Sequence, residues 1–390
     1  MKEDSNKTLK MLYLAKRLVF VTIIIYIVVF FVVNSSYLSK DNIARFTYTL
    51  RKTLTESYAE GREKKVSLMY DERETELIFK DGFALLSTGS LSVYSSDLLK
   101  FSSHKIGYKQ PVLLKSEDHL FCFDRGGNSI SVYDSFDKLK EKTFDNSIIN
   151  AAVSDSGYVA VITESYGYKG LVTILDKDLN EIMQWYSADY YLMYLGFTKK
   201  NTVSVITVVP NKENIDTYVV DLNYKTGEER SVICAENRFP LSAYIKHDNN
   251  LEVVSDTDIL TFRGDDFTPI YRYGSADIYS YRQFDEYSAI ISLTDSVKNI
   301  YRLTVIDTVG NVKFEKIVES YKDIQFFNDY FFILSNGKIT TVGLGGQEVG
   351  LKHVDSDIYK ILVSRGFALL VKPEQLNIIG SSELFEYSVQ

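Results

Sequence analysis

The longest apolar stretch of the chain lies close to its start. Residues 18–33 hold no charged side chain and consist almost entirely of Val, Ile, Leu and Phe. At helical rise they cover about 24 Å, slightly less than the ~30 Å hydrocarbon core of a bilayer, and flanking residues can complete the span. The pattern predicts a transmembrane signal-anchor helix over residues 18–37. A cleaved signal peptide and a buried soluble helix are the alternatives, but residues 1–17 are long for the basic region of a signal peptide.

Basic residues on either side of this run set its orientation. Five lie within residues 1–17, and two of them, Lys16 and Arg17, directly precede the run. Four more follow it within residues 38–52, so the asymmetry is small. The adjacent pair favours a single-pass protein of the cell membrane, with residues 1–17 cytoplasmic and the large domain extracytoplasmic. A propeller that faces the cytosol is the alternative.

The next segment, residues 38–65, shows a helical stripe. Its apolar positions, spaced by three or four residues, are Ile43, Phe46, Leu50, Leu54 and Tyr58. This spacing predicts an amphipathic stem helix that starts near Asp41 or Asn42 and ends by Gly61. We expect the helix to pack under the following domain or to lie on the membrane surface. A dimerisation coil is less favoured because one short stripe cannot sustain several heptads.

From residue 66 to 390 the pattern changes to short apolar strands separated by turns. Pairs of such strands recur eight times and begin at residues 82, 119, 158, 203, 251, 288, 330 and 366. A period near 40 residues built only of strands is typical of WD40-like propeller blades. The sequence therefore predicts an all-β fold, a β-propeller with eight blades, or seven as the alternative. Two stacked β-sandwiches fit the period less well.

The way in which the ring closes can also be predicted. Residues 66–70 precede the first blade and resemble an outer strand. We expect this segment to join the final blade beside residues 384–388. The pentapeptide Gly-Phe-Ala-Leu-Leu occurs at both 82–86 and 366–370, and ring closure would make these two blades neighbours.

Charge is unevenly distributed along the chain. The formal net charge is −8, but residues 1–17 and 34–65 each carry +3, which leaves −14 for residues 66–390. An acidic domain argues against a nucleic-acid partner, whereas a basic stem suits anionic lipid. The two cysteines, Cys122 and Cys234, both fall in predicted strands, and we interpret them as small buried hydrophobic residues and not as a disulfide.

The sequence indicates no catalytic residue, cofactor site or metal site. The four histidines lie in different repeats, at His104, His119, His247 and His353. None has a partner at ligand spacing. The glycine-rich segment 343–346 lacks the rest of a phosphate loop, and residues 154–157 and 265–266 lack the ligand pattern of a calcium loop. We interpret all three segments as turns.

Two aromatic clusters raise the question of carbohydrate stacking. They occupy residues 190–194 and 326–330. Strand alternation places half of each cluster between blades, so core packing is the favoured interpretation. Trp185 is the only tryptophan, which argues against the quinone-dependent dehydrogenase propellers, in which nearly every blade carries one.

The layout resembles a known family. A short basic N-terminus, one apolar helix, an amphipathic stem and blades of the form Gly-Phe-Ala-Leu-Leu-x(4)-Leu-x-Val-Tyr, as at residues 82–94, are similar to uncharacterised membrane-anchored propellers of clostridial-type bacteria, a domain-of-unknown-function family. The resemblance implies a fold and a location, and it supplies no catalytic residue.

We therefore expect a binding or scaffolding module at the cell envelope, anchored in lipid by its N-terminal helix, with an envelope protein or glycan as partner. The alternative is an envelope hydrolase or lyase that acts on glycan through carboxylates at the propeller axis. Axial carboxylates with raised pKa values would favour the enzyme, and a funnel of mixed apolar and polar groups would favour binding.

Overall fold

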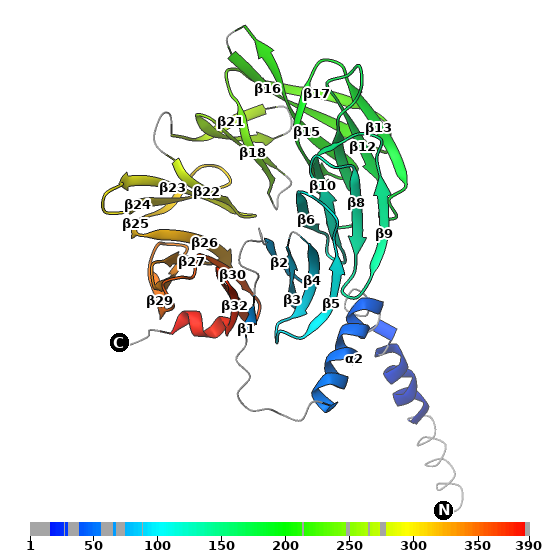
Figure 1. Ribbon diagram of the computed structural model, residues 1–390, viewed down its shortest axis with the longest axis vertical. Helices are drawn as coiled ribbons and strands as arrows, with labels where there is room; N and C mark the ends of the chain where they lie inside the picture. Colours follow the sequence, from blue (N-terminus) through cyan, green and yellow to red (C-terminus); the bar gives the residue numbers. More distant parts are fainter. Residues whose placement is uncertain are drawn as a thin grey trace, which may run out of the picture. The chain divides into compact units, whose positions relative to one another are not determined.

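The computed structural model describes residues 16–26, 28–29, 39–55, 65–67, 75–87, 89–212, 214–246, 250–263, 266–273 and 278–386. The chain divides into two compact units, Met1–Gly61 and Arg62–Gln390 (Figure 1).

The second unit consists of eight four-stranded antiparallel sheets, numbered here as blades 1 to 8 in chain order. The strands of blades 1 to 4 are β2 (Thr75–Phe79), β3 (Gly82–Leu86), β4 (Ser90–Ser95) and β5 (Lys100–Lys105); β6 (Pro111–Lys115), β7 (Leu120–Asp124), β8 (Ser129–Tyr133) and β9 (Lys138–Thr143); β10 (Ile148–Val153), β11 (Val159–Thr163), β12 (Gly170–Leu175) and β13 (Glu181–Ser187); β14 (Tyr191–Lys199), β15 (Thr202–Asn211), β16 (Asn214–Asn223) and β17 (Glu229–Ala235). Those of blades 5 to 8 are β18 (Pro240–Ile245), β19 (Leu251–Ser255), β20 (Asp258–Arg263) and β21 (Asp266–Arg272); β22 (Ile278–Gln283), β23 (Tyr287–Asp295), β24 (Ile300–Asp307) and β25 (Val312–Glu319); β26 (Tyr321–Phe327), β27 (Tyr330–Ser335), β28 (Lys338–Gly343) and β29 (Glu348–His353); β30 (Lys360–Ser364), β31 (Phe367–Lys372), β32 (Gln375–Gly380) and β1 (Lys65–Ser67).

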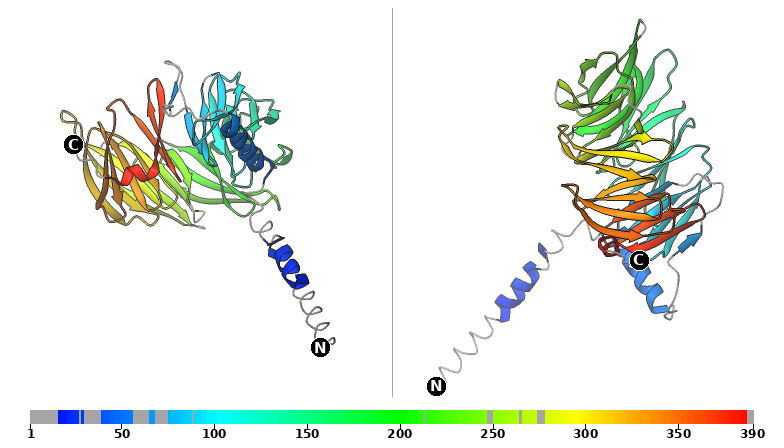
Figure 2. Two further views of the ribbon diagram at one scale, coloured as in Figure 1. Left: turned by 90° about the horizontal axis from the view of Figure 1, so that it is seen from below. Right: turned by 90° about the vertical axis from the view of Figure 1, so that its left-hand side faces the viewer.

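This architecture confirms the prediction of an eight-bladed propeller and excludes seven blades and the stacked sandwiches. Each predicted strand pair coincides with the second and third strands of one blade. The first strands of most neighbouring blades contact each other, β2 of blade 1 with β30 of blade 8 among them, so the first strands line the axis. Figure 2 shows successive sheets side by side around this ring.

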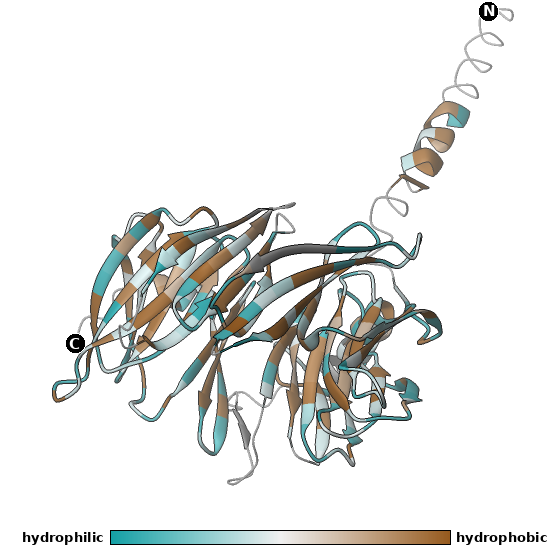
Figure 3. Cartoon of the chain, turned by 90° about the horizontal axis from the view of Figure 1, so that it is seen from above, coloured by the Kyte–Doolittle hydropathy of each residue, from teal (hydrophilic) through white to brown (hydrophobic). Residues whose placement is uncertain are grey.

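Burial follows from the position of a strand within its blade. The second strands are enclosed on both faces, and every residue of β3 is buried. The outer strand β9 has all but one residue exposed, and β25 alternates between buried and exposed positions. Figure 3 shows hydrophobic residues along the strands and hydrophilic residues in many of the turns. The alternation of apolar and polar residues in the sequence thus marks the outer strands.

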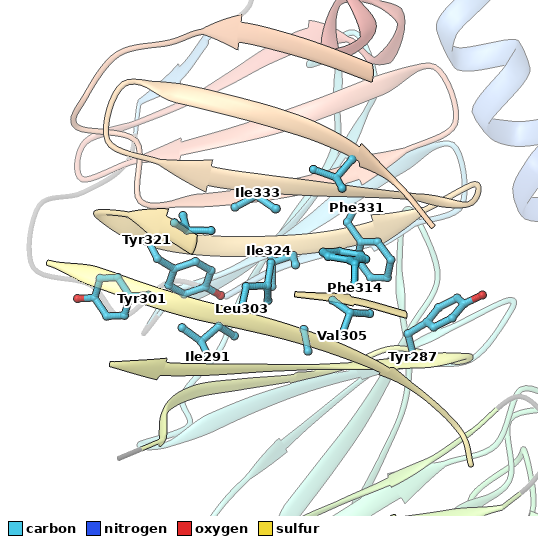
Figure 4. Packing of buried hydrophobic residues seen from close by; sticks show 13 residues of the cluster. Tyr287, Ile291, Tyr301, Leu303, Val305, Phe314, Tyr321, Ile324, Phe331 and Ile333 are labelled. Carbon is cyan, nitrogen blue, oxygen red and sulfur yellow. The ribbon is translucent and has the colours of Figure 1, made fainter. Parts of the chain in front are cut away.

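The core is a series of layers between neighbouring blades. Between blades 6 and 7, Leu303 and Val305 of β24 face Ile324 of β26 and Phe331 of β27 (Figure 4). The ring of Phe331 also packs against that of Phe314, with 5.4 Å between the ring centroids. Because each layer is shared by two blades, no blade buries its apolar faces alone.

The ring closes through a strand from the start of the second unit. β1 pairs with β32 in the antiparallel sense, with Val66 opposite Leu376. The expectation that this segment joins the last blade is confirmed, but its predicted partner, residues 384–388, is wrong. Residues Ser381–Phe385 form a 3-10 helix, η1, because the Glu383 carboxylate accepts the Gly380 amide at 3.0 Å and Leu384 is buried in the core.

In the first unit, the predicted stem helix is α2 (Lys40–Thr55). It begins two or three residues earlier than expected, since the Ser39 hydroxyl accepts the amide of Asn42 at 3.2 Å and Ser39 is therefore the N-cap. Asp41 and Asn42 lie inside the first turn, which corrects the predicted start. Gly61 lies outside the described residues.

The described part of the apolar run is residues 18–26 and 28–29, which are helical with exposed side chains. Among the residues described, no helix is both long enough and apolar enough to cross a membrane. Residue 27 and residues 30–37 of the predicted span lie outside that set.

Candidate functional site

A cleft of about 810 Å³ lies at one end of the first strands of five consecutive blades. Its walls come from Lys115 of blade 2, residues 152–158 of blade 3, residues 195–201 of blade 4, residues 244–246 of blade 5 and Asp285 of blade 6. The volume is typical of sites that bind a ligand or a peptide segment. The lining combines apolar side chains with both signs of charge.

The axial end of the cleft is polar. The Lys115 ammonium donates to the carbonyl oxygen of Ile78 in blade 1 at 2.9 Å. Although this side chain is accessible from the cleft, the surrounding walls lower the pKa of Lys115, and the nearby Asp285 and Asp155 oppose that effect. Desolvation therefore outweighs the two carboxylates at this position.

Tyr244 and Asp285 join blades 5 and 6 at the same end. The Tyr244 hydroxyl donates to the Asp285 carboxylate at 2.9 Å. Burial, reinforced by Asp285, raises the pKa of Tyr244 above its ordinary value. The phenol thus keeps its proton at neutral pH and holds the carboxylate in place.

Beneath these groups lies a buried ion pair. The Lys246 ammonium is 3.2 Å from Glu252 Oε1 and donates to the carbonyl oxygens of Phe284 and Tyr287 at 2.8 and 2.9 Å. Other donors to Glu252 Oε1 are Tyr281 (2.5 Å), Gln283 (2.8 Å) and Ser288 (2.7 Å). Surrounded in this way, the Glu252 carboxylate joins blades 5 and 6 and does not face a ligand as a free base.

The outer end of the cleft is aromatic. The rings of Tyr158 and Tyr224 stack with centroids 5.6 Å apart, and Phe197 meets Tyr224 edge-on at 6.3 Å. Lys199 and Lys200 are exposed beside these rings, and Lys199 pairs loosely with Asp221 at 3.6 Å. This end offers an apolar shelf with cations at its rim.

Two carboxylates on first strands also bridge blades. Glu76 of blade 1 pairs with Lys360 of blade 8 at 2.6 Å. Asp323 of blade 7 accepts from Arg282 of blade 6 at 3.3 Å and from the Ile361 amide of blade 8 at 3.1 Å. These carboxylates therefore hold the ring together.

The residues singled out from the sequence are not brought together. His104, His119 and His353 lie on different blades, and His247 falls outside the described residues. Within the residues described, no group of three or more His, Cys, Asp or Glu side chains could hold a metal ion. Cys122 is free and buried, as expected, and burial raises the pKa of its thiol to about 12. The side chain of Cys234 is not among those described.

The predicted turns have mixed outcomes. Residues 154–157 and 343–346 are turns, as expected. Of the third predicted turn, residues 265–266, Asp265 lies outside the described residues and Asp266 is the first residue of β21. The first of these turns also contributes Asp155 to the cleft, which the sequence did not suggest.

The aromatic clusters differ from each other. Phe326 packs against Phe331 with ring centroids 4.7 Å apart, which confirms a core role for that cluster. In the other cluster only Leu192 is buried, and Tyr191 is 43 % exposed. Core packing therefore explains residues 190–194 only in part. Trp185 is nearly buried and donates to Glu229 at 2.7 Å.

No feature of the sequence indicates the cleft as a whole. Its residues come from five repeats and share no motif. Their common feature is position, because most belong to the end of a first strand or to the turn that follows it. This relationship becomes visible only once the blade register is known.

Solved structures with a similar fold and one protein family match this chain. No curated protein matches the chain. Among solved structures, BamB from Moraxella catarrhalis shares 13% identity over 80% of this chain and 95% of that chain, with a TM-score of 0.51. The Dos1 propeller shares 12% over 84% and 96%, with a TM-score of 0.53, and a eukaryotic initiation factor shares 10% over 80% and 84%, with 0.52. At these identities the likeness shows the fold alone.

The family is shown by a match along most of the chain. Residues 55–380 match a family described as a family of unknown function, DUF5711. This range begins at the end of α2 and contains the strands of all eight blades. The chain therefore belongs to the DUF5711 family.

Proposed function

We propose that this protein is a membrane-anchored β-propeller that binds a segment of an envelope protein in the cleft at its axial end. The observation that carries the proposal is the cleft itself, since five blades contribute to one hollow with an aromatic shelf and a polar floor. The floor is rigid because Tyr244 and Lys246 are already hydrogen-bonded to the neighbouring blade. A preformed site of this kind binds without first having to order its own side chains.

The membrane anchor is the run at residues 18–33. It carries no charge, and its described part is helical with exposed apolar side chains. Lys16 and Arg17 support a cytoplasmic N-terminus and an extracytoplasmic propeller.

A protein segment suits the cleft better than a glycan or nucleic acid. Phe197, Tyr158 and Tyr224 form an apolar shelf for side chains, while the polar groups at the axial end can pair with a peptide backbone. The glycan hydrolase or lyase alternative depends on available axial carboxylates. Among the described residues, Glu76, Glu252 and Asp323 bridge blades, and Asp285, which lines the cleft together with Asp155, accepts from Tyr244. Asp155 and Asp285 are therefore the carboxylates on which that alternative would depend.

Site-specific photocrosslinking in living cells tests the proposal. A photoreactive phenylalanine analogue replaces Phe197 in the cleft, and the control replaces Ile317, which is 56 % exposed on the outer strand β25. We expect one protein to crosslink from position 197 and not from 317, and its purified form to bind the wild-type propeller but to bind the Tyr224→Ala variant more weakly. Equal crosslinking at both positions, or release of soluble fragments from cell-wall glycan by the purified protein, would overturn the binding role.

A further inference from the structure

The apolar stripe of α2 faces outward. Ile43, Phe46 and Leu50 are 48 %, 67 % and 47 % exposed. Their spacing of three and four residues places them on one side of the helix. An amphipathic helix of a globular domain normally buries this side, so the stripe needs an apolar environment that lies outside the described residues of this chain.

The charge of α2 indicates which environment that is. The helix carries four basic residues, Lys40, Arg45, Arg51 and Lys52, and one acidic residue, Asp41. Arg45 is buried, whereas Lys40 and Arg51 are exposed. Its net charge of +3 contrasts with the −14 carried by residues 66–390. An exposed apolar stripe on a cationic helix is complementary to an anionic lipid surface, which supplies both an apolar interior and negative headgroups.

Chain length brings α2 to such a surface. Seven peptide steps separate Val33, the end of the apolar run, from Lys40, and a fully extended chain covers at most about 25 Å over them. If the run is the membrane anchor, α2 cannot move far from the headgroups, and this tethering gives it a high effective concentration there.

We propose that α2 lies in the headgroup region of an anionic membrane, with Ile43, Phe46 and Leu50 in contact with lipid. This inference rests on the anchor of the proposed function and not on the cleft. A second copy of α2 is the competing occupant of the stripe.

Environment-sensitive labelling of the full chain in vesicles tests this arrangement. Phe46→Cys carries a polarity-sensitive fluorophore, and the matched control is Tyr48→Cys, which lies two residues along and so on a different side of the helix. Both variants also carry Cys234→Ser, so that the fluorophore reacts only with the introduced thiol. Cys122 can remain because it is buried. The vesicles contain phosphatidylcholine and phosphatidylglycerol at a ratio of seven to three, with and without lipids that carry a quencher.

We expect the probe at position 46 to be blue-shifted and quenched severalfold more strongly by the labelled lipid than the probe at position 48. Raising the salt concentration, or omitting phosphatidylglycerol, should weaken this difference. Equal quenching at the two positions would overturn the proposal. So would a blue shift at 46 that persists without lipid and disappears on dilution, because that result would assign the stripe to a second copy.

Failure of the interfacial position of α2 can be distinguished from failure of the membrane anchor. Extraction at alkaline pH reports the anchor independently. A protein that resists extraction but shows a water-exposed probe at position 46 would keep its anchor and lose the interfacial helix.

Discussion

Lys246 and Glu252 form an ion pair at 3.2 Å in which each side chain is only 1 % exposed. The pair lies where the axial cleft meets the junction of blades 5 and 6, and both charges are satisfied by groups from blade 6. The floor of the cleft and the integrity of the ring therefore depend on the same contacts.

Removing one member of this pair should destabilise the domain strongly. We expect Glu252→Gln to lower the free energy of unfolding by about 3–5 kcal/mol, because it leaves the Lys246 charge buried without its counter-ion. Denaturant unfolding followed by fluorescence measures the change. The control is Asp178→Asn, which removes an exposed pair with Lys140 at 2.6 Å and should cost less than about 1 kcal/mol. Equal losses for the two variants would contradict the role given to the buried pair.

A glycine at the junction of blades 5 and 6 should tolerate no side chain. Gly310 has a φ of +89°, and a Cβ placed there would lie 2.2 Å from the carbonyl oxygen of Ile270. Gly126 has a similar φ of +80° with open space around it. Both alanine variants should lose about 1–2 kcal/mol for the backbone conformation. We expect Gly310→Ala to lose a further ~1–3 kcal/mol from the clash, measured by thermal unfolding. Matching melting temperatures for the two variants would show that the backbone at the junction shifts to accommodate the added Cβ.

Ring closure by β1 can be tested with a disulfide. Val66 and Leu376 are directly opposite in the register, and cross-strand partners have Cα separations that suit a disulfide. We expect Val66→Cys with Leu376→Cys to crosslink under oxidation and to raise the melting temperature until reductant is added. The control pair, Val66→Cys with Phe385→Cys, follows the pairing predicted from sequence and should stay reduced. Crosslinking of the control instead would restore the original prediction.

Buried tyrosines should make the propeller sensitive to alkali. Burial raises the pKa of Tyr244, Tyr281 and Tyr321 above the ordinary value of 10.0. Above pH 10 the unfolded chain loses these protons while the folded chain keeps them. The contribution of the tyrosines to stability is therefore fully present below pH 10 and is lost as the pH rises. Between its unfolded and its folded pKa, each tyrosine lowers the free energy of unfolding by about 1.4 kcal/mol per pH unit. Unfolding as a function of pH checks the sign. Tyr281→Phe should flatten the fall, and an unchanged slope in that variant would argue against its contribution.

Much of the fold could be predicted from the sequence because the signals are local and repeated. Strand pairs such as 82–86 with 91–94 combine apolar runs with turn residues at the blade period, and the structure places them as β3 and β4. The pairing of residues 384–388 failed because Glu383 caps a short helix there, a contact that strand propensity does not contain. The stem helix starts earlier than predicted for a similar reason, since the Ser39 hydroxyl caps it.

The cleft could not be predicted from the sequence. Lys115, Asp155, Tyr244 and Asp285 are separated by up to 170 positions and become neighbours only when the ring closes. Lysine and aspartate near a turn usually face solvent, so their sequence context gave no reason to group them. Only the blade register, with its first strands at the axis, brings them into one hollow.

The extracytoplasmic, membrane-anchored location of the propeller is tested most directly by labelling the rim of the cleft in intact cells. Lys200→Cys, combined with Cys234→Ser, places one accessible thiol at that rim, and a membrane-impermeant maleimide reports its location. We expect rapid labelling in intact cells, in a protein that remains with the membrane after an alkaline wash. Labelling that occurs only after the cells are broken would contradict it.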